Sequence, residues 1–525
     1  MSSQRWLDLS IMLAYMAAMV WVGLRFSRRQ TSTEAYFVAK RSVPSWAMGL
    51  SLVATLITSV TFIAYPGSAY GKNWSLLIPG FLVVGVLIIA GAIVIPFYRR
   101  IVGMSAYEYF GKRFGKPTRM YSSFAFSLAH FSKMGFVFYL LALTINSMTG
   151  WSMDAVIVGV GIVTVFYTVI GGLEAVIWTD VIQGFVLWIG VFVCLGRLLF
   201  LPPGGPRAVL GLAWENHKFS LGSLQPNFSE PTILVLAIYG FFWYLQKYTA
   251  DQTVVQRYLV AKSDRDAIRG VALGAALCVP VWTLFMLIGT CTWSFFKLTG
   301  EPLPAYITKA DQVFPYFLTV HLPVGMAGLF MAALMGAAMS GLASDLNCLA
   351  VVGVEDFYRL RHPEATDRQR LRLGKIIVVA CGLLCIAIAD VLGHSKGGAL
   401  SMWFSISAIA SGGLAGLFLL AFFSTRATRQ GVYCGIAASV IFTAWATLTM
   451  GGKGVLDLGP LNYPWSDLMI GACAHIVLLV VGYAASLFFP PERSELSAMT
   501  IWTWLKVRKA FPDEPIAAVP HGRNA

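Results

Sequence analysis

The chain has 525 residues, of which 57% are hydrophobic and only 12% are charged. This balance is too apolar for a soluble protein of several domains, so a lipid bilayer is the expected solvent. The formal net charge of +14 does not indicate nucleic-acid binding, because the basic residues alternate from loop to loop as membrane topology requires.

Long apolar stretches run from one end of the chain to the other. About thirteen of them are long enough to cross roughly 30 Å of hydrocarbon as helices, which predicts an all-α polytopic membrane protein. No small-residue cleavage site follows the first stretch, so we expect it to be retained and not removed as a signal peptide. The stretches are Leu7–Leu24, Trp46–Tyr70, Leu77–Tyr98, Met120–Met148, Val156–Ile170, Val181–Leu199, Ile233–Tyr248, Gly270–Phe296, Leu322–Val354, Ile376–Leu392, Met402–Phe423, Val432–Met450 and Leu468–Phe488.

The loops between these stretches differ in charge. Clusters of arginine and lysine occur in every other loop, as in Arg25–Arg41, Arg99–Arg119 and Arg257–Arg269, whereas the opposite loops carry isolated lysines such as Lys72. Positively charged loops stay on the cytoplasmic side of a membrane. The pattern therefore predicts a multi-pass protein of the cell membrane with its N-terminus outside and its C-terminus inside.

Two apolar stretches carry interruptions that a plain spanning helix does not need. Residues 54–61 are rich in β-branched and hydroxyl side chains and are followed by Pro66, and residues 239–243 combine glycine with aromatic side chains. A broken helix exposes carbonyl groups in mid-bilayer, where they can bind a cation. The alternative is a continuous helix whose hydroxyls bond back to the preceding turn, and the sequence does not decide between the two.

A third feature is a face of small residues. Ala337, Ser340, Gly341 and Ser344 follow i, i+3, i+4, i+7 spacing and share one side of a helix. Close helix packing through small residues would explain this face. The other interpretation is that its hydroxyl groups supply oxygen ligands to a hard cation.

Lys133 is an ionisable group about midway along its apolar stretch, where burial of an ammonium costs at least about 2.5 kcal/mol. We interpret it as a contact for a polar or anionic solute, and the alternative is a structural pair with a carboxylate on a neighbouring helix. His130, one turn earlier, is interpreted as a packing histidine.

Asp180 stands at a predicted connection between two spans. It either caps a helix that begins at Val181 or acts as an acidic ion ligand or proton carrier, and its spacing leaves both open. Asp251 and Gln252 could latch the inner end of the sixth core helix, and the alternative is a surface ion pair of Asp251 with Arg257. No sequence motif of a hydrolase, zinc enzyme or nucleotide-binding loop is found, so an enzyme is not expected.

Three motifs carry a resemblance to a known family, and they are Trp178–Gln183, Asp251–Leu259 and Ala338–Asn347. From about Leu7 to Phe488 the chain resembles the sodium:solute symporter family, most of all its bacterial sialic acid branch. The resemblance implies the leucine-transporter fold of two inverted five-helix repeats. It implies an extra N-terminal helix in 1–26, repeats in 44–200 and 231–424, two C-terminal helices in 430–489 and a cytoplasmic tail in 490–525.

The resemblance also implies a main sodium site. Its ligands would be the backbone carbonyls of Ala54, Ile57 and Ala337 and the hydroxyl of Ser340. A second hydroxyl is usual beside that serine, and this sequence has Gly341 there.

A second sodium site of the sialic acid branch would involve Asp180, Ser340 and Ser344. The family places another serine at 343, where this sequence has Ala343. Only part of this second site is therefore present in this sequence.

The implied solute pocket contains Thr58, Thr61 and Lys133, with Lys133 in the place of a carboxylate-binding arginine. Lysine keeps the positive charge without the planar two-pronged grip of a guanidinium. Leu56 and Gly80 stand where polar residues would touch a sugar.

The sequence therefore predicts a sodium-coupled symporter that imports a small polar organic solute by alternating access. An anionic solute is favoured, such as sialic acid or a carboxylate. The alternatives are a neutral-sugar sodium symporter, a proton-coupled carrier in which Asp180 titrates, and a non-transporting solute sensor.

Overall fold

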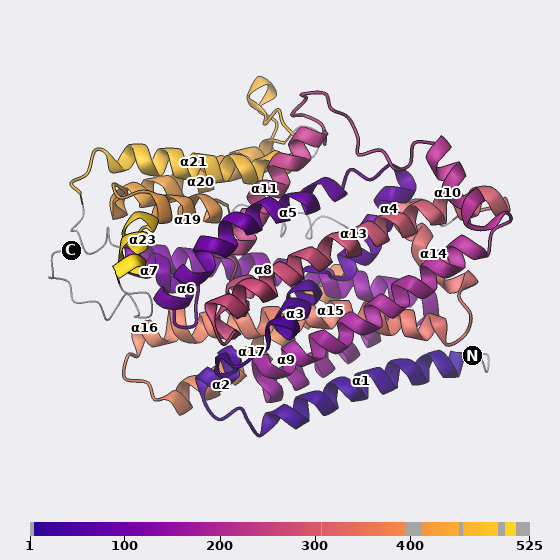
Figure 1. Cartoon of the computed structure of the whole chain (residues 1–525), viewed down its shortest axis with the longest axis horizontal. Helices are drawn as coiled ribbons and strands as arrows, with labels where there is room; N and C mark the ends of the chain where they lie inside the picture. The colour runs from indigo at the N-terminus through magenta and orange to yellow at the C-terminus, as the bar shows by residue number, and fades with distance from the viewer. Residues whose placement is uncertain (1–4, 306, 395–411, 451–454, 492–498, 511–525) are drawn as a thin grey trace.

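The computed structural model describes residues 5–305, 307–394, 412–450, 455–491 and 499–510. Within these ranges the secondary structure is helical, apart from an isolated backbone bridge between Val43 and Ala261. Most helices run along the long axis of the molecule (Figure 1), with α1 at one edge and α20 and α21 at the opposite edge. The predicted all-α architecture is confirmed.

The helical elements are named here in chain order. The α-helices are α1 (Arg5–Ser27), α2 (Thr33–Val38), α3 (Ser45–Leu56), α4 (Ser59–Gly71), α5 (Leu77–Ile89), α6 (Ile95–Ile101), α7 (Tyr107–Phe114), α8 (Lys116–Thr149), α9 (Met153–Phe200), α10 (Gly205–Glu215), α11 (Ile233–Ala250), α12 (Gln252–Val260), α13 (Asp264–Thr299), α14 (Val313–His321), α15 (Met326–Val351), α16 (Arg359–Arg361), α17 (Asp367–His394), α19 (Leu414–Phe423), α20 (Arg429–Thr449), α21 (Asp467–Ser486) and α23 (Ile501–Ala510). Short 3₁₀ segments are η1 (Ala39–Arg41), η3 (Ala310–Gln312) and η5 (Gly459–Leu461), and π-helical segments are η2 (Ala90–Val94) and η4 (Val352–Tyr358).

In the described residues, 8 helices are long and apolar enough to cross a membrane, or 9 with the bent pair α3 and α4. The predicted stretches fall on these helices and on shorter ones, and α9 carries two of them in 48 residues. Its two parts meet at Gly172, whose φ of 57° favours glycine. The early half of the predicted stretch Met402–Phe423, up to residue 411, lies outside the described residues.

The predicted interruption near Ala54 is present. Helix α3 ends at Leu56. The backbone of Ile57 and Thr58 is extended, and the chain changes direction by 59° before α4 continues. The hydroxyls of Thr58 and Thr61 form a reciprocal capping box that satisfies the free N–H groups at the start of α4. This segment is therefore two helices that share one passage through the bundle.

The second predicted interruption, at residues 239–243, is wrong in position. Helix α11 continues through Gly240, and the chain breaks at Asp251, whose backbone is extended and whose side chain caps α12. Gly240 serves close packing instead, because a Cβ atom there would lie 2.5 Å from the Cα atom of Pro79.

A similar close approach joins α4 to α13 and leads to a stability prediction. A Cβ atom at Gly289 would lie 2.6 Å from the Cα atom of Pro66 and would overlap its carbonyl group. Because overpacking of a tight contact costs about 1–3 kcal/mol, Gly289→Ala should lower the midpoint of thermal unfolding of the purified protein by about 1–3 °C. The matched control is Gly159→Ala, since a Cβ atom there meets nothing within 4 Å. Equal midpoints for the two variants would contradict this prediction.

Candidate functional site

The break between α3 and α4 creates a group of free backbone oxygens. The last carbonyls of a helix have no donor one turn further on, and Ala54 and Ile57 lie at this point of α3. Ala54, Ile57 and Ala337 of α15 together line a small cavity of about 10 Å³. A cavity of this size holds about one water-sized particle.

Ser340 lies one turn after Ala337 on α15 and is fully buried. Its hydroxyl donates to Asp180 Oδ1 at 2.6 Å. Because a hydroxyl that donates one hydrogen bond retains acceptor lone pairs, Ser340 can still offer an oxygen to a cation. Its neighbour Gly341 faces the break, and a Cβ atom there would stand 3.4 Å from the Thr58 methyl group, which is an ordinary contact.

Asp180 is a buried residue within α9, not the cap of a new helix. The capping interpretation is wrong because the chain turns at Gly172, so residue 180 already lies within the second part of α9. Its carboxylate accepts hydrogen bonds from Ser51 at 2.5 Å and from Ser340 at 2.6 Å. Asp180 therefore lies between α3 and α15, next to the break.

Arg257 is a buried residue whose position in the bundle the sequence did not predict. It was expected on the surface as a partner of Asp251, but it is fully buried. Its Nη2 lies 2.6 Å from Ser344 Oγ, 3.0 Å from Thr55 Oγ1 and 3.5 Å from Asp180 Oδ2. Asp180 and Ser344 are thus close together as predicted for a second cation site, with a guanidinium between them.

A chain of charged side chains crosses the bundle near the middle of α8. Lys133 Nζ donates to Asp345 Oδ1 at 3.0 Å, and His130 lies between Asp345 at 2.8 Å and Asp251 at 3.3 Å. Lys247 donates to Asp251 at 2.5 Å. The structural pair left open for Lys133 is present. His130 lies within hydrogen-bond distance of two carboxylates, so it is not only a packing residue. Asp345 could have been found from the sequence, since a carboxylate inside an apolar span is rare and needs a partner.

Lys133 also borders a cavity of about 690 Å³ between α8, α11, α20 and α21. Its side chain is 30% exposed, and Tyr239, Gln246 and Lys247 line the same space. Such a volume accommodates a small organic molecule.

The other residues predicted for the solute pocket are not among the side chains that line this cavity in the described structure. Thr58 and Thr61 cap α4. Leu56 is the last residue of α3, and Gly80 packs against the Trp282 ring, where a Cβ atom would lie 2.7 Å from a ring carbon. The structure therefore does not gather the five predicted residues around one described cavity.

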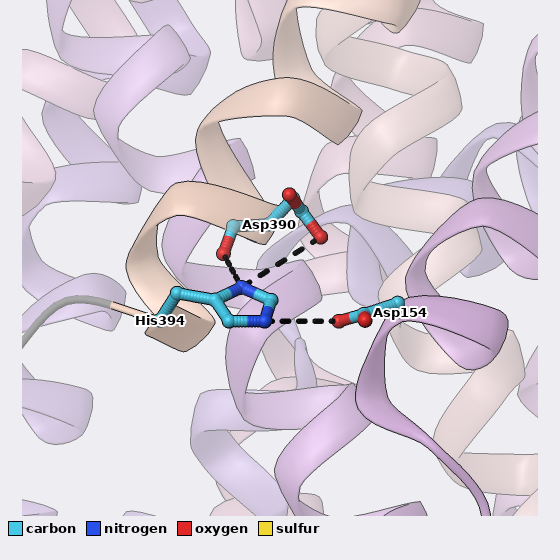
Figure 2. A group of neighbouring side chains, drawn as sticks. All are labelled: Asp154, Asp390 and His394. Carbon is cyan, nitrogen blue, oxygen red and sulfur yellow. Dashed lines mark hydrogen bonds and ion pairs between the residues drawn. The ribbon is translucent and has the colours of Figure 1, made fainter.

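A separate cluster of Asp154, Asp390 and His394 joins the ends of α9 and α17 (Figure 2). His394 Nε2 lies 3.8 Å from Asp154, while its Nδ1 faces the Asp390 carbonyl at 2.9 Å and the Asp390 carboxylate at 4.0 Å. The two carboxylates approach different ring nitrogens, and all three side chains are substantially exposed. We interpret this cluster as a surface contact between the two helices.

A bundle of spanning helices, one of them broken in mid-passage opposite a small hydroxyl-bearing face, defines a secondary transporter that binds a cation. The comparison with protein families agrees with this class. The family model of the sodium:solute symporter family matches residues 36–438, and the chain belongs to this family. It is therefore a multi-pass, sodium-coupled membrane transporter and not an enzyme.

Alignments with individual relatives cover most of this chain. The sodium/sialic acid symporter NanT of Aliivibrio fischeri is 32% identical over 93% of this chain and 95% of that protein. The sodium/sialic acid symporter SiaT of Proteus mirabilis is 32% identical over 83% of this chain and 88% of that protein. A solved outward-open, substrate-bound structure of a Na⁺-coupled sialic acid symporter matches with a TM-score of 0.85 at 29% identity, and covers 93% of this chain and 99% of that one. These matches confirm the leucine-transporter fold.

Proposed function

We propose that this protein imports a sialic acid or a similar sugar acid together with sodium, by alternating access across the cell membrane. The observation that carries the coupling is the broken α3–α4 passage, where Ala54, Ile57 and Ala337 line a cavity of ionic size. The similarity to two sialic acid symporters and the ammonium group of Lys133 at the edge of a larger cavity support the solute class.

The proposed sodium ligands are the carbonyl oxygens of Ala54, Ile57 and Ala337 and the hydroxyl oxygen of Ser340. All four residues are buried, and three of them line the same small cavity. Inward movement of sodium down a membrane potential releases about 2.3 kcal/mol per charge for each 100 mV, besides its concentration term. This energy would drive the solute against its own gradient.

Transport by the purified protein in liposomes tests this function. Labelled sialic acid should accumulate when an inward sodium gradient is imposed, and not with potassium or a pH gradient alone. Accumulation driven by a pH gradient without sodium would instead support the proton-coupled alternative. Inhibition by neutral sugars but not by sugar acids would support a neutral-sugar symporter, and solute binding without uptake would indicate a sensor.

The protein lies in the cell membrane, which in bacteria is the inner membrane. The proposed orientation places the N-terminus outside the cell and the C-terminus in the cytoplasm. The alternating basic loops support this orientation. A reporter that is active only in the cytoplasm should function when fused after residue 525 and not when fused before residue 1. The reverse result would contradict the proposed topology.

The proposed sodium site also predicts a gain of affinity. Gly341→Ser should place a hydroxyl beside Ser340, because a Cβ atom fits 3.4 Å from the Thr58 methyl group. An added oxygen ligand worth about 1 kcal/mol would lower the sodium concentration for half-maximal uptake about fivefold. Gly341→Ala is the matched control, since it adds the Cβ atom without the oxygen. If both variants respond to sodium alike, the hydroxyl does not reach the ion.

A further inference from the structure

An apolar crevice of about 290 Å³ lies between η2, α11, α19 and α21. Its lining side chains are apolar apart from Thr249, whose hydroxyl donates to the Leu245 carbonyl of its own helix, and His475. Phe242 and His475 also line the cavity that Lys133 borders, so the two spaces share a wall. Because water finds few hydrogen-bond partners in such a crevice, it suits a hydrocarbon chain.

The rim of the crevice faces the lipid side of the bundle. Phe241 of α11, Phe423 of α19 and Ile476 of α21 line it and are 36%, 41% and 46% exposed. Helix α21 is long and apolar enough to cross a membrane, so the bilayer is the solvent at this rim. An acyl chain can therefore enter from the side without passing a polar surface.

One end of the crevice lies beside aromatic and cationic side chains. Phe423 is the last residue of α19, and α23 packs against this helix (Figure 1). Trp502 Nε1 of α23 donates to the Phe423 carbonyl at 2.7 Å, and Lys506 on the same helix is exposed.

Arg426 adds a second positive charge three residues after Phe423. Its Nη2 donates to the Phe489 carbonyl at 2.9 Å, and its Nη1 is buried without a hydrogen-bond partner among the described residues. Tryptophan beside arginine and lysine is typical of the level of the lipid head groups. A guanidinium with a donor to spare suits a phosphate oxygen.

We propose that this crevice binds an anionic phospholipid, with one acyl chain between η2, α11, α19 and α21 and the phosphate beside Arg426 and Lys506. The proposed topology places this end of α19 at the cytoplasmic surface, where anionic lipids are attracted by basic side chains. A zwitterionic head group pairs less well with these cations, because its own ammonium group offsets the phosphate. This site is separate from the proposed sodium ligands and adds a lipid partner to the transport function.

Counting retained lipid tests the inference on the full-length protein. The protein is reconstituted in vesicles of equal parts phosphatidylglycerol and phosphatidylcholine, extracted in mild detergent and weighed by native mass spectrometry. The wild type should retain about one phosphatidylglycerol per chain in preference to phosphatidylcholine. Retention of no lipid, or of both lipids equally, would overturn the inference.

Filling the crevice gives a second test. Leu419→Trp should lower the retention of phosphatidylglycerol at least about fivefold, because the larger side chain takes the space of the acyl chain. Ile441→Trp is the matched control, since Ile441 is 68% exposed on α20 and does not line the crevice. Equal retention by the two variants would place the lipid elsewhere and overturn the proposed site.

The head-group contacts are tested separately. Arg426→Gln and Lys506→Gln should each lower the preference for phosphatidylglycerol over phosphatidylcholine about fivefold, because each removes one positive charge near the membrane surface. Arg361→Gln is the matched control, an exposed arginine of α16 that should leave the preference unchanged. If Arg426→Gln does not fold, Lys506→Gln decides. An unchanged preference in Lys506→Gln would overturn the proposed phosphate position.

Discussion

Ser340→Ala is expected to raise the sodium concentration for half-maximal uptake by about tenfold to a hundredfold. Ser340 would supply the one side-chain oxygen of the proposed sodium site, and its hydroxyl also donates to the buried carboxylate of Asp180 at 2.6 Å. The variant loses a ligand and leaves a carboxylate oxygen without a donor, and each loss weakens the site. Initial rates of solute uptake into liposomes, measured against sodium concentration, give this value directly.

The control for this experiment is Ser127→Ala. The Ser127 hydroxyl bonds only within its own helix, to the Ser123 carbonyl at 2.8 Å, so its removal should leave the sodium dependence unchanged. If Ser340→Ala shows the same sodium activation as the wild type, Ser340 does not bind the ion. A shift in solute affinity without a shift in sodium affinity would lead to the same conclusion.

The second large effect is expected at Lys133 and Asp345. Lys133→Gln should raise the KM for an anionic solute by at least about tenfold, because the cavity loses an ammonium group that can pair with a carboxylate. The same change leaves the buried Asp345 without its lysine, so it should also lower the midpoint of thermal unfolding. The single variant therefore mixes solute binding with stability.

The double variant Lys133→Gln/Asp345→Asn separates the two effects. It removes both charges of the pair, so thermal stability should recover by a coupling energy of about 0.5–3 kcal/mol. If Lys133 binds the solute, the KM of this stable double variant stays high for an anionic solute and not for a neutral one. A wild-type KM in the double variant would mean that Lys133 serves only to neutralise Asp345.

Much of the fold could be predicted because the bilayer imposes strong rules on the sequence. Long apolar stretches and basic loops predict the spanning segments. The β-branched and hydroxyl residues before Pro66 made a broken helix one of two alternatives, and the structure decides for the break. The second break was misplaced because Gly240 was interpreted as an interruption. The structure uses Gly240 for contact with Pro79, a residue about 160 positions earlier that no local pattern could identify.

The surroundings of the Arg257 side chain show why the site was harder to predict than the fold. Ser344 and Asp180 could be named from a family resemblance, but the occupant of the space between them could not. Arg257 and Asp180 are 77 positions apart, and Arg257 and Ser344 are 87 apart. In the sequence, Arg257 begins a run of basic residues typical of a cytoplasmic loop, and only the packing of α12 against α3 and α15 shows that its side chain points inward.

The guanidinium of Arg257 has a mechanical consequence. Because one side chain is bonded to residues of α3 and α15 and to its own helix α12, these segments cannot slide past each other unless several bonds break together. We expect them to move as a single block during the transport cycle. Most of the bending would then fall on the extended residues Ile57 and Thr58, so that the part of the chain that holds the ion would also serve as the hinge.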